Sequence, residues 1–182
     1  MARTLLAPGA RHRFREARVA MRPFALIALA ATLATALPAQ AQNAGQIARA
    51  RGGASCPKCN LFQADFSGLR LVGKTFAGAR LRQSDLSASV MNRTSFAGAD
   101  LRDVNAYGGV FTGASFAGAN LTHASFVGTY LEGANFAGAV LDGTNFSGAE
   151  MGRARGLTPA QLSRACGDEA TELPPGLRLR PC

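Results

Sequence analysis

The four cysteines are the residues of this 182-residue sequence whose types and spacing most directly suggest chemistry. Cys56 and Cys59 form a C-x-x-C motif, the spacing of thioredoxin-type dithiols. No βαβ pattern surrounds the motif, and Cys59 occupies the first small inward position of a repeat described below. A zinc site would need the other pair, Cys166 and Cys182, from the far end of that repeat. The sequence therefore favours a structural role for the cysteines, and neither a metal ion nor a cofactor is expected.

A second group of chemistry-bearing residues surrounds His123. Ser125 is its near neighbour in the sequence, and the acids Asp103 and Asp142 supply the third residue type of a nucleophilic triad. A triad needs three groups held by packing in one pocket, whereas His123 falls at a solvent-facing corner of the repeat. No phosphate-binding loop, metal-ligand cluster or nucleotide fingerprint occurs in the sequence. The sequence predicts a protein that is not an enzyme, with no catalytic residues.

The composition allows one ordinary globular domain. Hydrophobic residues make up 47% of the chain and charged residues 17%, which excludes an acidic or charge-rich disordered protein. The formal net charge is +9, but residues 1–41 hold six arginines and only one acid. Much of the basic character therefore belongs to a segment that we expect to be removed.

That segment has the order of a secretory signal peptide from Met21 onward. Arg22 is followed by an uncharged apolar run over residues 24–37 and by an A-x-A site that ends at Ala41. The run is shorter than the roughly 20 residues of a membrane-spanning helix. We expect cleavage after Ala41 and a periplasmic or secreted location. We also expect translation to begin at Met21, because residues 1–20 are arginine-rich and fit no secretory segment.

A five-residue repeat fills the centre of the sequence. Every fifth residue from 61 to 151 is large and apolar, with Ala106 as the exception, and the residue two places earlier is usually small. A period of five suits neither a helix nor a flat strand, so the chain must bend at every repeat to keep both residues inward. The predicted core residues are Leu61, Phe66, Leu71, Phe76, Leu81, Leu86, Met91, Phe96, Leu101, Phe111, Phe116, Leu121, Phe126, Leu131, Phe136, Leu141, Phe146 and Met151.

A second period of 20 residues fixes the number of sides. The segment Phe-Ala-Gly-Ala recurs at 76–79, 96–99, 116–119 and 136–139, and leucine returns every 20 residues from Leu61 to Leu141. Four five-residue sides therefore make one coil, and the repeat predicts about 4.75 coils. At the β-strand spacing of about 4.8 Å, the core would be about 23 Å long. The expected fold class is an all-β solenoid whose coils cover one another's apolar faces.

These units resemble those of the bacterial pentapeptide-repeat family, as in Ala-Asp-Phe-Ser-Gly at 64–68 and Ala-Asn-Phe-Ala-Gly at 134–138. The resemblance covers residues 59–155 and implies a right-handed quadrilateral β-helix. Two residues depart from the pattern: Lys74 takes a small inward position, and Ala106 takes a large one. Ala106 leaves either a void or a space that Tyr107 fills, and the sequence does not distinguish the two.

The predicted domain organisation adds an end segment on each side of the repeat. Residues 1–41 form a presequence, 42–58 an N-terminal lead-in, 59–155 the repeat, and 156–182 a capping helix and tail. Thr158, Pro159 and Gln161 form a capping box that predicts a short helix over about 159–166.

The cysteines are expected to form two disulfides, because an exported chain meets an oxidising environment. The repeat separates Cys56 and Cys59 from Cys166 and Cys182 by about 23 Å, far beyond the reach of a disulfide. We therefore predict that Cys56 pairs with Cys59, and that Cys166 pairs with Cys182 and ties the proline-rich tail to the cap helix.

Two surface clusters stand out when the sequence is wrapped on four sides. One is apolar and marks a candidate interaction surface; it comprises Val90, Tyr107, Val110, Val127 and Tyr130. The other is a candidate basic patch on the leucine side, formed by Arg80, Arg82 and Arg102. Because Asp100 and Asp142 share that side, a mixed solvated face is the favoured interpretation of the basic patch.

Three hypotheses for the function follow. The first is a non-enzymatic, exported β-solenoid scaffold with a structural or protein-interaction role, whose partner is an unknown protein or a second copy. The second is weak binding to an anionic envelope polymer or lipid surface through the arginines. The third, implied by the family resemblance, is DNA mimicry that shields DNA gyrase. Mimicry requires an acidic surface, whereas residues 56–156 hold nine basic and seven acidic residues, and no nucleic-acid partner is expected.

Overall fold

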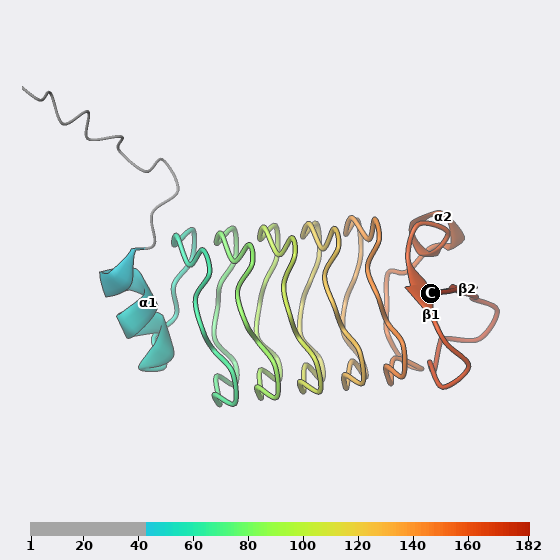
Figure 1. The fold of residues 1–182 in the computed structure, drawn as a ribbon, viewed down its shortest axis with the longest axis horizontal. Coiled ribbons are helices and arrows are strands. Elements are labelled where there is room, and N and C mark those ends of the chain that lie inside the picture. Colours follow the sequence, from blue (N-terminus) through green and yellow to red (C-terminus); the bar gives the residue numbers. More distant parts are fainter. Residues whose placement is uncertain (1–42) are drawn as a thin grey trace, which may run out of the picture. The chain divides into compact units, whose positions relative to one another are not determined.

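The structure is a computed structural model that describes residues 43–182. Its regular elements are helix α1 (Ala44–Arg51), helix α2 (Pro159–Leu162) and the strands β1 (Cys166–Gly167) and β2 (Arg180–Pro181). Between the two helices the chain winds into the coils of a solenoid (Figure 1). The expected leader, its cleavage site and the start at Met21 lie outside the described residues.

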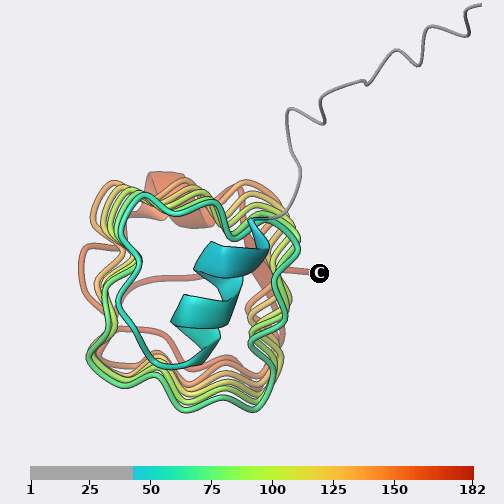
Figure 2. The same cartoon turned by 90° about the vertical axis from the view of Figure 1, so that its left-hand side faces the viewer.

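Each coil of the solenoid has 20 residues and four sides, as the end-on view in Figure 2 shows. Parallel β-bridges join residues 20 positions apart, from Asn60 and Arg80 to Asn135 and Arg155. Each side contributes a single bridge to each neighbouring coil, so the sides are too short to form long strands. We number the sides from first to fourth by the inward residues of the first coil, which are in order Leu61, Phe66, Leu71 and Phe76.

Backbone hydrogen bonds hold consecutive coils together. From Leu61 to Phe136, the amide of every fifth, inward residue donates to a carbonyl 19 residues later, as from Leu61 to Arg80 at 2.8 Å. The amide of Arg80 donates in return to the carbonyl of Cys59 at 2.8 Å. Each corner closes with a local bond, such as the one from the Ala79 amide to the Phe76 carbonyl at 2.9 Å. The corner residues have positive φ, which explains why most of them are glycine.

The interior consists of the repeating large and small side chains. None of the predicted core residues exposes more than 2% of its surface. On the fourth side, the rings of Phe76, Phe96, Phe116 and Phe136 stack with centroid distances of 5.7, 5.3 and 5.2 Å. Burying one such side chain contributes about 1.5–3 kcal/mol, so the four rings together contribute about 6–12 kcal/mol to the stabilising free energy.

The small residue at position 106 is compensated by a neighbouring ring. Tyr107 is 61% exposed and therefore does not fill the space beside Ala106. Phe111, on the third side of the same coil, is fully buried, and its ring lies against Gly109. A Cβ atom on Gly109 would be 2.5 Å from Cε2 of Phe111 and 3.1 Å from the carbonyl oxygen of Ala106. The missing side chain at Gly109 thus makes room for a ring larger than the leucine or methionine found elsewhere on this side.

Helix α1 covers the N-terminal end of the solenoid (Figure 2). The side chain of Asn43 accepts a hydrogen bond from the amide of Gln46 and caps the helix. Ala50 is fully buried. Oε1 of Gln46 accepts a hydrogen bond from the amide of Asn60 at 2.6 Å, which replaces a bond to a preceding coil. This helix lies in the predicted lead-in but was not predicted, although Asn43 at its start and Gly52 at its end are typical signals.

Helix α2 lies at the other end and is shorter than expected. Thr158 and Gln161 form the capping box, and Leu162 is fully buried. Nε2 of Gln161 donates to two carbonyls of the last coil. The prediction that the helix continues to residue 166 is wrong, because Ser163 ends the helix and Cys166 forms a β-bridge to Asn145. The hydrogen bonds of the solenoid therefore resume where helical bonds were expected.

The C-terminal tail adds a further layer. Strand β2 pairs with β1 in parallel, and the amide of Cys182 donates to the carbonyl of Gly167 at 3.0 Å. In the structure Cys166 is disulfide-bonded to Cys182, and Cys56 to Cys59. Within residues 43–182, no helix has the length and apolar character required to cross a membrane.

The fit between Gly109 and Phe111 can be tested by two substitutions. Gly109→Ala should lower the free energy of unfolding by about 1–3 kcal/mol, because the added methyl group collides with the ring. Combining it with Phe111→Leu should cost less than the sum of the two single changes. Urea unfolding of both single variants and the double variant measures this coupling. Strictly additive effects would contradict the proposed fit.

Candidate interaction surfaces

The groups available for function lie on the outward positions of the coils. Outward residues alternate with the inward ones, and they form rows in which equivalent side chains of successive coils lie side by side. Among the described residues, no group of three or more histidine, cysteine, aspartate or glutamate side chains is placed to hold a metal ion. The rows, corners and ends of the solenoid are therefore the candidate sites.

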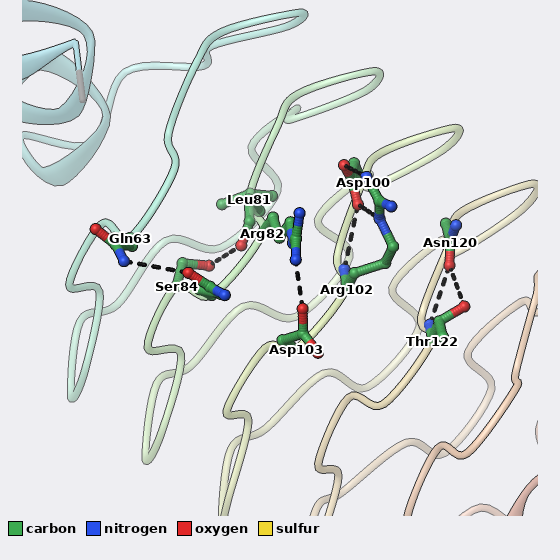
Figure 3. A network of polar contacts seen from close by, with 10 residues as sticks. Gln63, Leu81, Arg82, Ser84, Asp100, Arg102, Asp103, Asn120 and Thr122 are labelled. Carbon is green, nitrogen blue, oxygen red and sulfur yellow. Dashed lines mark hydrogen bonds and ion pairs between the residues drawn. The ribbon is translucent and has the colours of Figure 1, made fainter. Parts of the chain in front are cut away.

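The first side carries the predicted basic patch, and Figure 3 shows its polar contacts. The guanidinium of Arg102 makes two hydrogen bonds to the carboxylate of Asp100, through Nε and Nη2, each at 2.7 Å. Nε of Arg82 donates to Oδ2 of Asp103 at 3.2 Å across to the next coil. The hydrogen bond from Arg102 is the main cause that lowers the pKa of Asp100 below its ordinary value.

These contacts change what the first side can bind. Arg82 and Arg102 each have a carboxylate partner, and Arg80 lies in the same outward row as Asp100, to which it is β-bridged. Asp142 of the same side pairs with Arg164 of the tail. The three arginines are close together, but they belong to a mixed-charge array. An anionic ligand would have to displace internal carboxylates from two of them.

The corner between the first and second sides holds polar residues in consecutive coils. Nε2 of Gln63 donates to Oε1 of Gln83 at 3.1 Å, and Asp103 and His123 continue the row. His123 is exposed, and its ring covers Gly143 of the next coil. Asp103 and Asp142 are paired with arginines, and no hydrogen bond among the described residues joins His123 to Ser125. The geometry does not form a triad.

The predicted apolar cluster surrounds the corner between the second and third sides. Val110 is β-bridged to Val90 on one side and to Tyr130 on the other, so these three form a continuous row. Tyr107 and Val127 lie on the second side in adjacent coils, just across the corner. Tyr107 is 61% exposed and Tyr130 is 45% exposed, whereas the three valines are half-buried.

The corner inside this cluster carries no side chain in two successive coils. Its residues are Gly108 and Gly128, and a Cβ atom at either position would meet no atom within 4 Å. A partner could therefore contact both tyrosines without obstruction from a corner side chain. We call Tyr107, Val110, Val127 and Tyr130 the tyrosine cluster.

A surface hollow that the sequence did not predict lies at the C-terminal end. It has a volume of about 520 Å³ and lies between Ser147 of the solenoid and tail residues that include Asp168, Leu179 and Cys182. Oδ1 of Asp168 already accepts a hydrogen bond from the amide of Gly148 at 2.8 Å, which is the main cause that lowers the pKa of Asp168. The sequence carried no signal for this hollow, because it depends on how the tail folds back.

The cysteines have structural positions in this arrangement. Cys56 and Cys59 are both buried at the beginning of the first coil, where the Cys56 amide donates to the carbonyl of Thr75. Cys182 ties the end of the tail to β1. No described cysteine has a free thiol. The disulfide of the C-x-x-C motif therefore has a structural position within the first turn of the solenoid.

The sequence matches a family model described as pentapeptide repeats. Eight copies of the repeat match, over residues 59–96, 79–118 and 114–153, which together span just over half of the chain. None of the curated proteins matches the sequence significantly.

Several solved structures are similar to this chain. A pentapeptide repeat protein from the thylakoid lumen of Arabidopsis thaliana is 32% identical, with 48% of this chain and 53% of that chain covered and a TM-score of 0.29. HetL, a protein involved in heterocyst differentiation regulation in the cyanobacterium Nostoc sp. strain PCC 7120, is 26% identical, with coverages of 70% and 61% and a TM-score of 0.39. QnrB1, a plasmid-mediated fluoroquinolone resistance protein, is 19% identical, with coverages of 68% and 78% and a TM-score of 0.38. The chain thus spans less than two thirds of the first two proteins.

The pair between Asp100 and Arg102 predicts a pH-dependent contribution to stability. Because the pKa of Asp100 is lowered in the folded state, the pair stabilises the fold above the ordinary carboxyl pKa, and this contribution is lost as the pH falls through the lowered value. Asp100→Asn should lower the free energy of unfolding by about 0.5 kcal/mol at pH 7 and by less at pH 3, which lies below the ordinary carboxyl pKa. Urea unfolding at both pH values measures it, with Arg102→Gln and the double variant completing the cycle. An equal effect at both pH values would contradict the prediction.

Proposed function

Because the chain belongs to the pentapeptide repeat family, we propose that it is a non-enzymatic scaffold that binds another protein through the tyrosine cluster. The coils of this family form a right-handed quadrilateral β-helix, and the sequence corresponds to about 4.75 of them. The proposal assigns the inward residues to the fold and the outward residues to recognition.

The exposure of two tyrosines on neighbouring coils is the observation that supports this proposal. Tyr107 and Tyr130 are the two most exposed of the large hydrophobic residues in the described part of the chain. Their phenol groups add hydrogen-bonding capacity to an apolar surface, which is why tyrosine is enriched at the energetic centres of protein interfaces. Val110 lies beside Tyr130 in its row, and Val127 is the equivalent of Tyr107 in the next coil; both are half-buried and contribute apolar area.

The rigidity of the backbone favours binding at this position. The backbone of each residue of the cluster is hydrogen-bonded to the preceding coil, as from the Tyr130 amide to the Gly109 carbonyl and from the Ala88 amide to the Tyr107 carbonyl. A partner would therefore bind a preformed surface, and little backbone entropy would be lost on association. The partner expected for such a surface presents its own apolar and aromatic side chains.

We also propose that the scaffold acts outside the cytoplasm. The signal-like order of residues 21–41 supports export, and the two disulfides are the form expected of the cysteines in an oxidising compartment. Both disulfides lie where the solenoid begins or ends. They would stabilise the two ends outside the reducing cytoplasm.

Site-specific crosslinking can test the tyrosine cluster. A photo-crosslinking amino acid at Tyr107 should capture one defined partner in the native host, whereas the same residue at Ala97, on the fourth side, should not. Tyr130→Glu should abolish the crosslink, and Tyr130→Ala should weaken binding of the identified partner at least tenfold. Thr122→Ala, on the first side, serves as the control for an unrelated outward position. Equal crosslinking from Tyr107 and Ala97 would reject the cluster as the binding site.

Export can be tested by the intact mass of the protein recovered from its host. Spectra recorded with and without reduction and thiol alkylation report the N-terminus and the cysteine state together. A chain that begins at Gln42 and has no alkylatable thiol is the expected result. An uncleaved chain with four free thiols would contradict both export and the disulfides.

A further inference from the structure

The charges of the described residues are unevenly distributed along the solenoid. Residues 43–78 hold five basic residues and a single acid, Asp65, whereas residues 79–152 hold four basic and six acidic residues. The N-terminal end is therefore strongly basic, although the first side, where the basic patch was predicted, is a mixed-charge array. The five basic residues are Arg49, Arg51, Lys58, Arg70 and Lys74.

These five residues surround one end of the molecule. Arg49 and Arg51 are in the last turn of α1, which crosses the opening of the first coil (Figure 2). Lys58 lies at the corner before the first side, Arg70 lies on the third side, and Lys74 is the half-buried residue that follows the corner at Gly73, all in the first coil. We call this set the basic end.

The basic end has few internal partners. Within residues 43–182, one ion pair joins these five side chains to a carboxylate. It links Arg51 to Asp65 at 3.3 Å. Arg49, Lys58 and Arg70 are exposed. By contrast, Arg82 and Arg102 on the first side are both paired. Four of the five cations at the basic end therefore lack a carboxylate partner among the described residues, and residues 43–78 carry a larger net positive charge than residues 153–182, which hold five basic and three acidic residues.

Apolar side chains accompany these cations. Val72, in the first coil, is 37% exposed, and Ile47 of α1 is only partly buried against the core. Cations next to exposed apolar side chains match a bilayer surface, where anionic headgroups lie above hydrocarbon. A soluble polyanion would satisfy only the charges.

The position of the expected leader points to the same partner. The apolar run ends at Leu37, six residues before Asn43. Six residues span at most roughly 20 Å, so the described part of the chain begins within that length of the apolar run. If the chain is exported, the cations of the basic end would therefore follow the leader as the chain crosses the membrane.

We infer that the basic end docks on a membrane surface that carries anionic phospholipid headgroups. The solenoid then contacts the bilayer end-on, through α1 and the rim of the first coil. Tyr107 and Tyr130 lie on the flanks of later coils, so they remain accessible to a protein partner. The docking does not depend on the identity of that partner.

Vesicle binding by matched charge variants tests this inference. The full chain carrying Lys58→Gln, Arg70→Gln and Lys74→Gln is compared with one carrying Arg153→Gln, Arg155→Gln and Arg178→Gln, which removes the same charge from the opposite end. Vesicles of phosphatidylcholine with and without 30% phosphatidylglycerol measure charge-dependent binding, and the contribution of the basic residues 1–41 is the same in both variants. Co-sedimentation measures binding, and circular dichroism on heating checks that both variants fold.

The first variant should bind anionic vesicles at least tenfold more weakly than the unmodified chain, and the second should bind about as well as the unmodified chain. Raising the salt concentration should remove the difference between the two variants. Equal losses in both variants would show that only net charge matters, and no loss in the first would also overturn the inference. Soluble polyphosphate that competes fully with the vesicles at equal phosphate concentration would assign the basic end to polyanions in general.

Discussion

The repeated backbone hydrogen bond between residues about 20 positions apart is the constraint on which the rest of this structure depends. It requires every coil to have the same perimeter, so a change in one inward side chain must be balanced within the same coil. Ala106, Gly109 and Phe111 show such a balance, because a small residue on one side is accompanied by a large ring and a missing side chain on the next. The interior therefore tolerates variation only in coordinated sets.

The same hydrogen bonds create unsatisfied edges at the two ends, and the chain uses different devices to cover them. At the start, a side-chain oxygen of Gln46 accepts the amide hydrogen of Asn60. At the C-terminal end, the side-chain amide of Gln161 donates to two backbone carbonyls of the solenoid, and the tail adds a pair of short strands. Both ends also carry a disulfide. Each end lacks the adjacent coil that interior coils have, so other groups must supply the hydrogen-bond partners. For this reason the fold is not periodic at the two ends.

This difference explains how far the sequence could predict the structure. The inward residues were predictable because each large position recurs at a fixed spacing, and departures such as Lys74 were visible against that pattern. Helix α1 was missed because it is outside the repeat and has weak amphipathic character, and α2 was predicted too long because nothing local shows that Cys166 returns to the solenoid. The pairing of Arg82 with Asp103 depends on side-chain reach between coils, which the spacing of residue types does not determine. The tyrosine cluster could be placed because its residues belong to the repeat.

The absence of any insertion between Leu61 and Met151 has a consequence for how such a chain can change over evolutionary time. Duplication or loss of one complete 20-residue coil would leave every other coil in register, whereas a gain or loss of one or two residues would move inward side chains to the outside. In this part of the chain, changes in length that keep the fold therefore come in steps of one 20-residue coil. Point substitutions at outward positions have little effect on the fold. A lineage could lengthen the distance between the N-terminal end and the tyrosines in steps of about 4.8 Å, as on a molecular ruler.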